Sequence, residues 1–310
     1  MRLRANIFLL LFVFSFSLYA QKSDSIHANL FEPSKTFNKT RRNFVVGAEI
    51  IGGTGIMLGL DQLWYAHYPR SSFHFFNDND EWLQMDKMGH AQTSYSVGQT
   101  GYNVLKWAGV KDRNALWAGG TLGLMFTSVV EVMDGFSTQW GFSLGDFAAD
   151  ASGTLLFVGQ QALWHEQRIK YKWTFMPSPY AQYRPNVLGK DLSQQWLKDY
   201  NGQTYWFSVN VASFLPEQSK YPKWLNLALG YGADGMTGGS ENPLLVNGQA
   251  IPYFDRSRQF YLSFDIDFNQ MRIKNKFLKS ILSSVGFIKI PAPALEFSPG
   301  RGVFLHPLFF

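Results

Sequence analysis

No cysteine occurs in the sequence of 310 residues. A disulfide framework is therefore excluded, and the chain offers no thiol to which a lipoprotein anchor could be attached. Excess charge of one sign is also small, because the formal net charge is +5 and the basic residues are scattered. We therefore expect no nucleic-acid partner. Neither a P-loop nor a His-Glu-x-x-His zinc motif occurs, so neither class of enzyme is indicated.

The first 20 residues have the plan of a secretory signal peptide. Arg2 and Arg4 precede an apolar run over residues 7–14, and Ala20 supplies the small residue before a cleavage site. We expect cleavage after Ala20, which predicts an exported protein of the periplasm or outer membrane of a Gram-negative-type cell. The alternative is an uncleaved anchor helix, although the run is short for a membrane span. Residues 21–43 are polar and show no periodic pattern of apolar residues, which predicts a flexible N-terminal segment, called the lead-in below.

Aromatic residues are abundant, at 17% of the chain with 10 Trp and 28 Phe. Four apolar segments follow the lead-in, at 44–65, 87–108, 114–135 and 143–165, and each is long enough for a helix that crosses a bilayer core. Small residues recur every four positions in three of them, as Gly55/Gly59, Gly119/Gly123 and Gly145/Ala149/Gly153, which favours close helix packing. We therefore predict a helical bundle over residues 44–170.

An inner-membrane bundle is disfavoured, because the charged links between the segments oppose the positive-inside tendency. The second segment also contains several amide and hydroxyl side chains, which do not insert easily. We expect instead an exported bundle that contacts or lies beside the outer membrane, with a membrane surface or lipid as partner and an envelope protein as a further candidate partner.

The pattern changes to a period of two after about residue 170. Apolar residues alternate with small or polar ones over 225–231 and 260–268, and residues 205–215 are a third candidate strand. Residues 272–286 then have the pattern of a basic amphipathic helix, which suits either an anionic membrane surface or the closure of a sheet. The aromatic C-terminal end resembles that of outer-membrane β-barrel proteins, but too few strands are visible to close a barrel. The predicted fold class is α+β, with an antiparallel β-rich region over residues 171–310.

Acidic residues gather at helical spacing within the apolar segments. Asp86 and His90 share a helix face at i,i+4, Glu131 and Asp134 do so at i,i+3, and Asp146 and Asp150 do so at i,i+4. Carboxylates among apolar residues are costly unless paired, so we expect the three pairs to face one another, with Lys87 and His90 as counter-charges.

Two interpretations of this cluster stay open. It can be a buried ionic network that fixes helix register, which requires no cofactor. It can instead bind a divalent metal ion, and the metal candidates are His90, Asp86, Glu131, Asp134, Asp146 and Asp150. The catalytic candidates for a hydrolytic reaction are Asp86, Lys87, His90, Glu131 and Asp134.

The order of these motifs resembles that of a known family. The motifs are Asp86-Lys87-x-x-His90, Glu131-x-x-Asp134 and Gly141-Phe-Ser-x-Gly-Asp146-x-x-Ala149-Asp150-x-x-Gly153. Over about residues 80–165 they resemble the YfiM-like family of predicted periplasmic lipoproteins, which has no assigned activity, and more distantly the VanZ-like family of small helical membrane proteins. The resemblance implies a helical domain of the cell envelope. The sequence departs from these families in lacking a lipobox cysteine and in having Asp150 where VanZ-like proteins more often have an amide.

Two functions follow as hypotheses. The first is a non-enzymatic role in the cell envelope, through organisation of the envelope or binding of a partner or lipid. The second is a metal-dependent hydrolase or transferase that acts on an envelope lipid or glycan.

Overall fold

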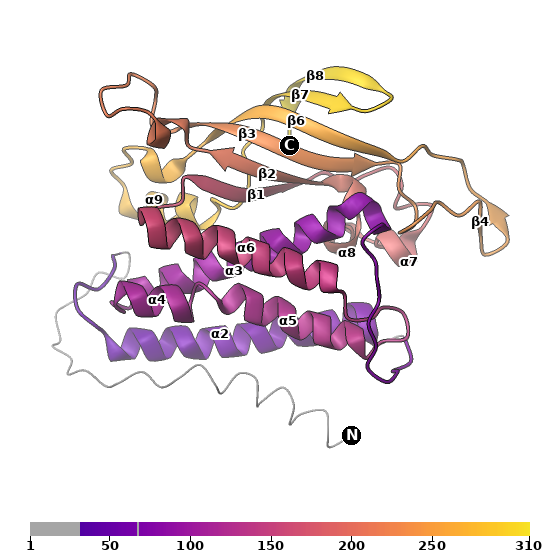
Figure 1. Cartoon of the computed structure of the whole chain (residues 1–310), viewed down its shortest axis with the longest axis horizontal. Helices are drawn as coiled ribbons and strands as arrows, with labels where there is room; N and C mark the ends of the chain where they lie inside the picture. Colours follow the sequence, from indigo (N-terminus) through magenta and orange to yellow (C-terminus); the bar gives the residue numbers. More distant parts are fainter. Residues whose placement is uncertain (1–31, 67) are drawn as a thin grey trace.

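A computed structural model describes residues 32–66 and 68–310 of the protein. Helices make up the N-terminal half and a six-stranded antiparallel sheet makes up most of the C-terminal half, so the α+β prediction is confirmed (Figure 1). The expected signal peptide over residues 1–20 lies outside the described residues, as does the lead-in up to residue 31.

The helices follow the predicted segments closely. They are α2 (Lys39–Leu60), continued by η1 (Asp61–Tyr65), then η2 (Glu81–Gln84), α3 (Met85–Trp107), α4 (Asp112–Ala118), α5 (Leu122–Gly135) and α6 (Leu144–Trp164). Next to the sheet lie α3 and α6, followed by α4 and α5, with α2 farthest away (Figure 1). The third predicted segment is divided into α4 and α5 at Gly119 and Gly120.

The first helix begins earlier than expected, inside the predicted lead-in. Asn38 caps α2 by accepting a hydrogen bond from the backbone N–H of Arg41 at 3.0 Å. The Arg41 side chain is buried, donates to the carbonyl of Glu32 at 2.8 Å and lies over the Trp107 ring at 4.3 Å. These contacts tie residues 38–43 to the end of α3, so this part of the lead-in is ordered.

Small residues let α3 approach its neighbours closely. A Cβ atom on Gly123 of α5 would lie 1.8 Å from the carbonyl oxygen of Ser94, and one on Gly153 of α6 would lie 1.9 Å from that of Ala91. The predicted close packing is therefore confirmed at these glycines. Gly55 and Gly59 of α2 are not at such close approaches, because a Cβ atom at either position would meet open space.

Two helical stretches, Lys39–Tyr65 and Asp112–Gly135, are long and apolar enough to cross a membrane. Only 11% of the most apolar part of the first is buried, compared with 39% for the second. Since α5 packs against α3 and α6, the second stretch serves as a core helix in this fold. The first stretch, α2 with η1, exposes apolar side chains such as Ile51, which is 75% exposed.

The sheet contains β1 (Ile169–Phe175), β2 (Gln203–Val209), β3 (Leu225–Asp234), β6 (Ser257–Ile266), β7 (Ala292–Ser298) and β8 (Gly302–Phe309), paired in that order. A hairpin of β4 (Leu245–Val246) and β5 (Gln249–Ala250) stands apart. Strands β3 and β6 agree with predicted ones, and β2 covers only the first part of the third candidate, 205–215, because it ends at Val209. Strands β1, β7 and β8 were not predicted. In the described part of the chain β1 and β8 are the two edges, so the sheet is open.

Short helices connect the strands. They are α7 (Pro185–Leu188), α8 (Leu192–Lys198), α9 (Lys276–Ser284) and the single turns η3 (Tyr200–Gly202), η4 (Val211–Phe214) and η5 (Phe268–Gln270). The amphipathic helix predicted over 272–286 is thus the shorter α9.

One face of the sheet is apolar from edge to edge. Strand register places the following residues in one row across the strands: Tyr171, Phe207, Leu229, Leu262, Leu295 and Leu305. The row is buried where β1 and β2 meet α3, with Tyr171 2% exposed, and it is open from β3 onward, with Leu305 73% exposed. The helices therefore cover only part of this apolar face.

The opposite face of the sheet is buried and carries polar groups. Lys172 Nζ lies 2.6 Å from Asp265 Oδ2, and both side chains are almost completely buried. Trp206, Tyr261 and Phe309 pack against one another in a separate cluster, and Lys289 Nζ lies 4.5 Å from the Trp206 ring. Along β6 and β7 the polar or small residues are buried and the apolar ones are exposed, the reverse of the usual soluble sheet.

Before α3 the chain makes a left-handed turn. Trp82, Leu83 and Gln84 have φ values of 49°, 50° and 64°. The turn is held by the C-terminal half, because the Trp82 N–H donates to the Gly239 carbonyl at 2.8 Å and the Tyr231 hydroxyl donates to the Leu83 carbonyl. A run of such conformations in non-glycine residues is costly and persists only where the surroundings impose it.

Candidate functional site

The predicted polar residues lie together between α3, α5 and α6. Helix α3 supplies Asp86, Lys87 and His90, α5 supplies Glu131 and Asp134, and α6 supplies Asp146 and Asp150. The structure therefore brings the three predicted pairs into one cluster, with Asp134 at its margin, where it accepts a hydrogen bond from the Tyr65 hydroxyl at 2.7 Å.

Lys87 is the centre of one half of the cluster. Its Nζ lies 2.5 Å from Asp78 Oδ1, 2.8 Å from Asp146 Oδ1 and 3.7 Å from Asp86 Oδ2. Asp78 belongs to the loop before α3 and was not among the predicted site residues. It also accepts a hydrogen bond from the Ser143 hydroxyl at 2.6 Å, which connects the loop to the start of α6.

His90 is the centre of the other half. Its Nδ1 lies 3.1 Å from Asp150 Oδ1 and 3.6 Å from Glu131 Oε1, while its Nε2 lies 4.0 Å from Asp86 Oδ1. The second oxygen of Glu131 accepts from the Ser143 N–H at 3.0 Å. Asp86 in turn accepts from the hydroxyl of Tyr200, a residue of the C-terminal half.

Burial and mutual repulsion shift the pKa values of the acidic groups. Burial raises the pKa of Glu131 to about 8, of Asp134 to about 7 and of Asp146 to about 9. Burial by itself lowers the pKa of the two basic groups, Lys87 and His90, but the neighbouring carboxylates raise it by more. The pKa of Lys87 is raised to about 12 through Asp86 and Asp146, and that of His90 lies well above its usual value through Asp150 and Asp86.

Two carboxylate oxygens beside His90 have no hydrogen-bond partner. They are Glu131 Oε1 and Asp150 Oδ2, and the side chains are only 1% and 0% exposed. Six carboxylates therefore share two basic side chains, and the set of groups is richer in acceptors than in donors. This arrangement can bind a cation, or it can hold protons on some of its carboxyl groups.

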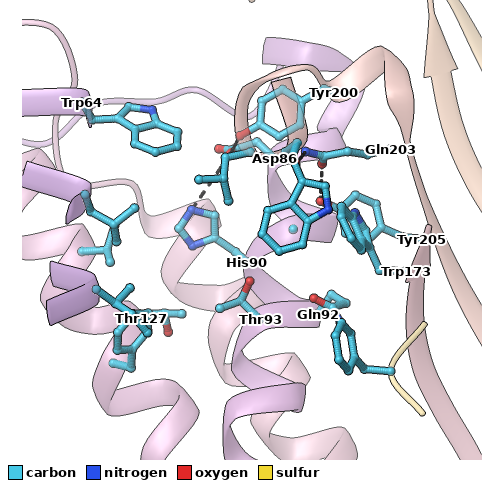
Figure 2. A pocket seen from close by; sticks show the side chains of 18 residues that line it. Trp64, Asp86, His90, Gln92, Thr93, Thr127, Trp173, Tyr200, Gln203 and Tyr205 are labelled. Atoms are coloured by element: carbon cyan, nitrogen blue, oxygen red, sulfur yellow. Dashed lines mark hydrogen bonds and ion pairs between the residues drawn. The ribbon is translucent and has the colours of Figure 1, made fainter. Parts of the chain in front are cut away.

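A cavity of about 350 Å³ lies beside the cluster. Asp86 and His90 form its polar end together with Tyr200 (Figure 2). In the view of Figure 2, Trp64 lies on one side of them and Trp173 and Tyr205 on the other. The walls are mostly apolar and come from α2, α5, α8 and the first two strands, with Ile56, Leu60, Trp64, Phe126, Val130, Trp173, Trp196 and Leu197. No local sequence pattern predicts this cavity, because its wall joins residues from both halves of the chain.

Residues 141–145, Gly-Phe-Ser-Leu-Gly, have the letters of a Gly-x-Ser-x-Gly nucleophile motif. Their geometry is different from that motif, in which a serine stands on a sharp turn between a strand and a helix. Ser143 is the N-cap of α6, where its hydroxyl accepts from the Asp146 N–H at 3.1 Å and donates to Asp78. Its hydroxyl is thus used for capping, and none of the described histidines contacts it.

Residues 74–159 match the sequence profile of a family described as predicted periplasmic lipoproteins (DUF2279). No curated protein and no solved structure gives a significant match. The matched stretch contains the cluster from Asp78 to Asp150, whereas Tyr200 and the sheet lie outside it. The resemblance to periplasmic lipoproteins is thus confirmed over this stretch, and the VanZ-like resemblance has no support.

The family match agrees with the expected location of the protein in the cell envelope, exported to the periplasm or outer membrane.

Proposed function

We propose that this protein is a membrane-associated, non-enzymatic component of the cell envelope that binds an amphipathic lipid in the cavity beside Asp86 and His90. The cavity carries the proposal. Its mostly apolar walls, with Asp86 and His90 among its polar lining residues, match a molecule with an apolar chain and a polar head group, and its volume of about 350 Å³ lies within the usual range of ligand sites.

The polar residues of the cavity limit the kinds of head group that can bind there. Asp86 and His90 are among these residues, and the carboxylates behind them outnumber the basic groups. A hydroxyl or amine head group can donate hydrogen bonds to Asp86. We therefore favour a lipid whose head group is neutral or basic.

Membrane association is supported by the exposed apolar surfaces. Helix α2 forms one wall of the cavity with Ile56 and Leu60, and its outward face exposes Ile51 and Leu58. The open part of the sheet exposes a second apolar surface on β3, β6, β7 and β8, including Leu262 and Leu305. Exposed apolar patches of this extent mark sites of contact with a membrane or a protein.

Lipid binding is tested by filling the cavity. The protein is purified in non-ionic detergent, and the lipids bound to it are measured by native mass spectrometry. We expect Val130→Trp, in the cavity wall, to lose the bound lipid, whereas Met125→Trp, on the exposed side of the same helix, keeps it. Equal lipid content in both variants, each shown to be folded by its thermal transition, would contradict the proposal.

Membrane association is tested separately with vesicles of phosphatidylethanolamine and phosphatidylglycerol. Leu305→Asp places a carboxylate on the exposed apolar sheet face and should weaken vesicle binding severalfold, because a charge facing lipid is costly. Ser219→Asp adds the same charge in an exposed loop and should leave binding unchanged. If both variants bind like the unmodified protein, the sheet face is not the membrane contact and a protein partner becomes the better candidate for it.

A second candidate function is a metal-dependent hydrolase or transferase acting on an envelope lipid or glycan. The observation that favours it is the pair of unpartnered carboxylate oxygens on Glu131 and Asp150, two side chains that lie beside His90, a residue that lines the cavity. Turnover of a lipid or glycan by metal-loaded protein, abolished in His90→Ala, would favour this function over the non-enzymatic one.

A further inference from the structure

We infer that His90, Glu131 and Asp150 form a binding site for one divalent cation of the zinc, manganese or ferrous iron class. The inference does not depend on lipid binding. One imidazole nitrogen and two carboxylate oxygens are ligands that these ions accept. The three side chains come from three different helices, α3, α5 and α6, so a bound ion would link these helices to one another.

The spacing of the three ligand atoms suits a common ion. His90 Nδ1 lies 3.1 Å from Asp150 Oδ1 and 3.6 Å from Glu131 Oε1. Ligands at about 2.0–2.2 Å from a zinc ion in tetrahedral geometry are separated from one another by about 3.3–3.6 Å. Only small shifts of the side chains are therefore needed to place an ion between them.

The unpartnered oxygens are the second observation. Glu131 Oε1 and Asp150 Oδ2 are buried and accept no hydrogen bond. A buried carboxylate oxygen without a partner is costly, and such groups in folded proteins are usually paired or bound to a metal. A cation placed between His90 Nδ1 and Glu131 Oε1 would satisfy the Glu131 oxygen.

A competing set of ligands, Asp86, His90 and Asp146, is also close enough in space, and Asp146 Oδ1 likewise accepts no hydrogen bond, but both of its carboxylates already lie beside another polar side chain. Asp86 Oδ1 accepts from the Tyr200 hydroxyl, and Asp146 Oδ1 lies 2.8 Å from Lys87 Nζ. The cation therefore belongs on the Glu131 and Asp150 side of the imidazole.

Asp86 then becomes a positioning residue. Its Oδ1 lies 4.0 Å from His90 Nε2, on the side of the ring away from Glu131 and Asp150. Histidines that bind a metal through one nitrogen commonly donate the other N–H to a carboxylate, which fixes the ring. Asp86 and His90 also line the cavity.

The test uses the full mature chain in detergent, stripped with a chelator and then titrated with Zn²⁺, Mn²⁺ or Fe²⁺. We expect one ion per chain by elemental analysis after gel filtration, and a higher thermal transition with the ion. Glu131→Gln and His90→Ala should each weaken binding at least about 100-fold, more than the effect of removing an outer partner. Binding should also weaken as the pH falls, because the ion competes with a proton for the imidazole.

Asp134→Asn is the matched control. It removes a neighbouring carboxylate that bonds Tyr65 and is not in the proposed set of ligands, so affinity should stay within a few fold of the unmodified protein. Co²⁺ added in place of zinc gives a visible absorption spectrum, which should change in His90→Ala and stay the same in Asp134→Asn. The inference is overturned if the folded protein binds no ion stoichiometrically, or if Asp134→Asn weakens binding as much as Glu131→Gln.

Discussion

Replacing Glu131 with glutamine should change the pH dependence of stability in the metal-free protein. Burial raises the pKa of Glu131 from 4.5 to about 8, so the folded protein holds a proton that the unfolded chain has released over this pH range. Such a carboxyl group does not change the free energy of unfolding below pH 4.5. As the pH rises it lowers the stability of the folded protein progressively, and the full loss is reached above about pH 8.

The size of the change in the free energy of unfolding follows from the difference between the two pKa values of Glu131. Each pH unit costs about 1.4 kcal/mol for one group, so the free energy of unfolding falls by up to about 5 kcal/mol between pH 4.5 and 8. Glutamine has no such titration and can still accept the hydrogen bond from the Ser143 N–H. Its amide group adds a cost of about 1–3 kcal/mol if left unpaired. We therefore expect Glu131→Gln to be about 2 kcal/mol or more stabilising at pH 9 and neutral or destabilising at pH 5.

The assay is urea unfolding followed by tryptophan fluorescence, in non-ionic detergent with a chelator, at several pH values. The stability curves of the two proteins should cross between pH 5 and 9. Parallel curves, or a variant that is less stable at pH 9, would refute the assignment of Glu131 as a carboxyl group held neutral by burial. With saturating Zn²⁺ the order at pH 9 should reverse, since only the unmodified protein keeps the complete set of ligands.

Five further variants test the packing and the ion pairs by chemical denaturation. Gly153→Val should destabilise by about 3 kcal/mol or more, because its Cβ would meet the Ala91 carbonyl, whereas Gly159→Ala on the same helix meets open space and should be neutral or stabilising by up to about 1 kcal/mol. Lys87→Met should cost about 3–5 kcal/mol at pH 8, because it leaves Asp78 without its counter-charge. Lys172→Met should cost a similar amount by leaving Asp265 buried and unpaired, and the double variant with Asp265→Leu should recover much of the loss.

The helices and their cluster could be predicted because the information is local. The spacing of Asp86 from His90, or of Asp146 from Asp150, places both members of a pair on one helix face whatever the rest of the fold does. Because a buried carboxylate without a partner is costly, the polar faces of these helices are predicted to meet. The structure confirms this for Glu131 and Asp150, which lie beside His90. Asp78 and Tyr200 could not be predicted in the same way, because each reaches the cluster from a loop or turn through tertiary packing.

The sheet was harder to predict because its pairing is not local. Strand β1 contains Lys170 and Lys172, which obscure its alternation, and their partners Asp267 and Asp265 lie almost a hundred residues later. Strands β7 and β8 contain Pro293 and Pro307, which weaken a strand pattern. The periodic pattern of β6 was recognised, but a period of two does not reveal which face is buried.

The left-handed turn at Trp82, Leu83 and Gln84 has a consequence for the order of folding. Its conformation is unfavourable in isolation, and the groups that hold it, Gly239 and Tyr231, are synthesised about 150 residues later. Helix α3 can form early from local contacts, but the turn that leads into it should settle only once β3 has docked. Refolding should therefore show a late kinetic phase in which secondary structure is already present while Asp86, two residues beyond the turn, acquires its hydrogen bond from Tyr200.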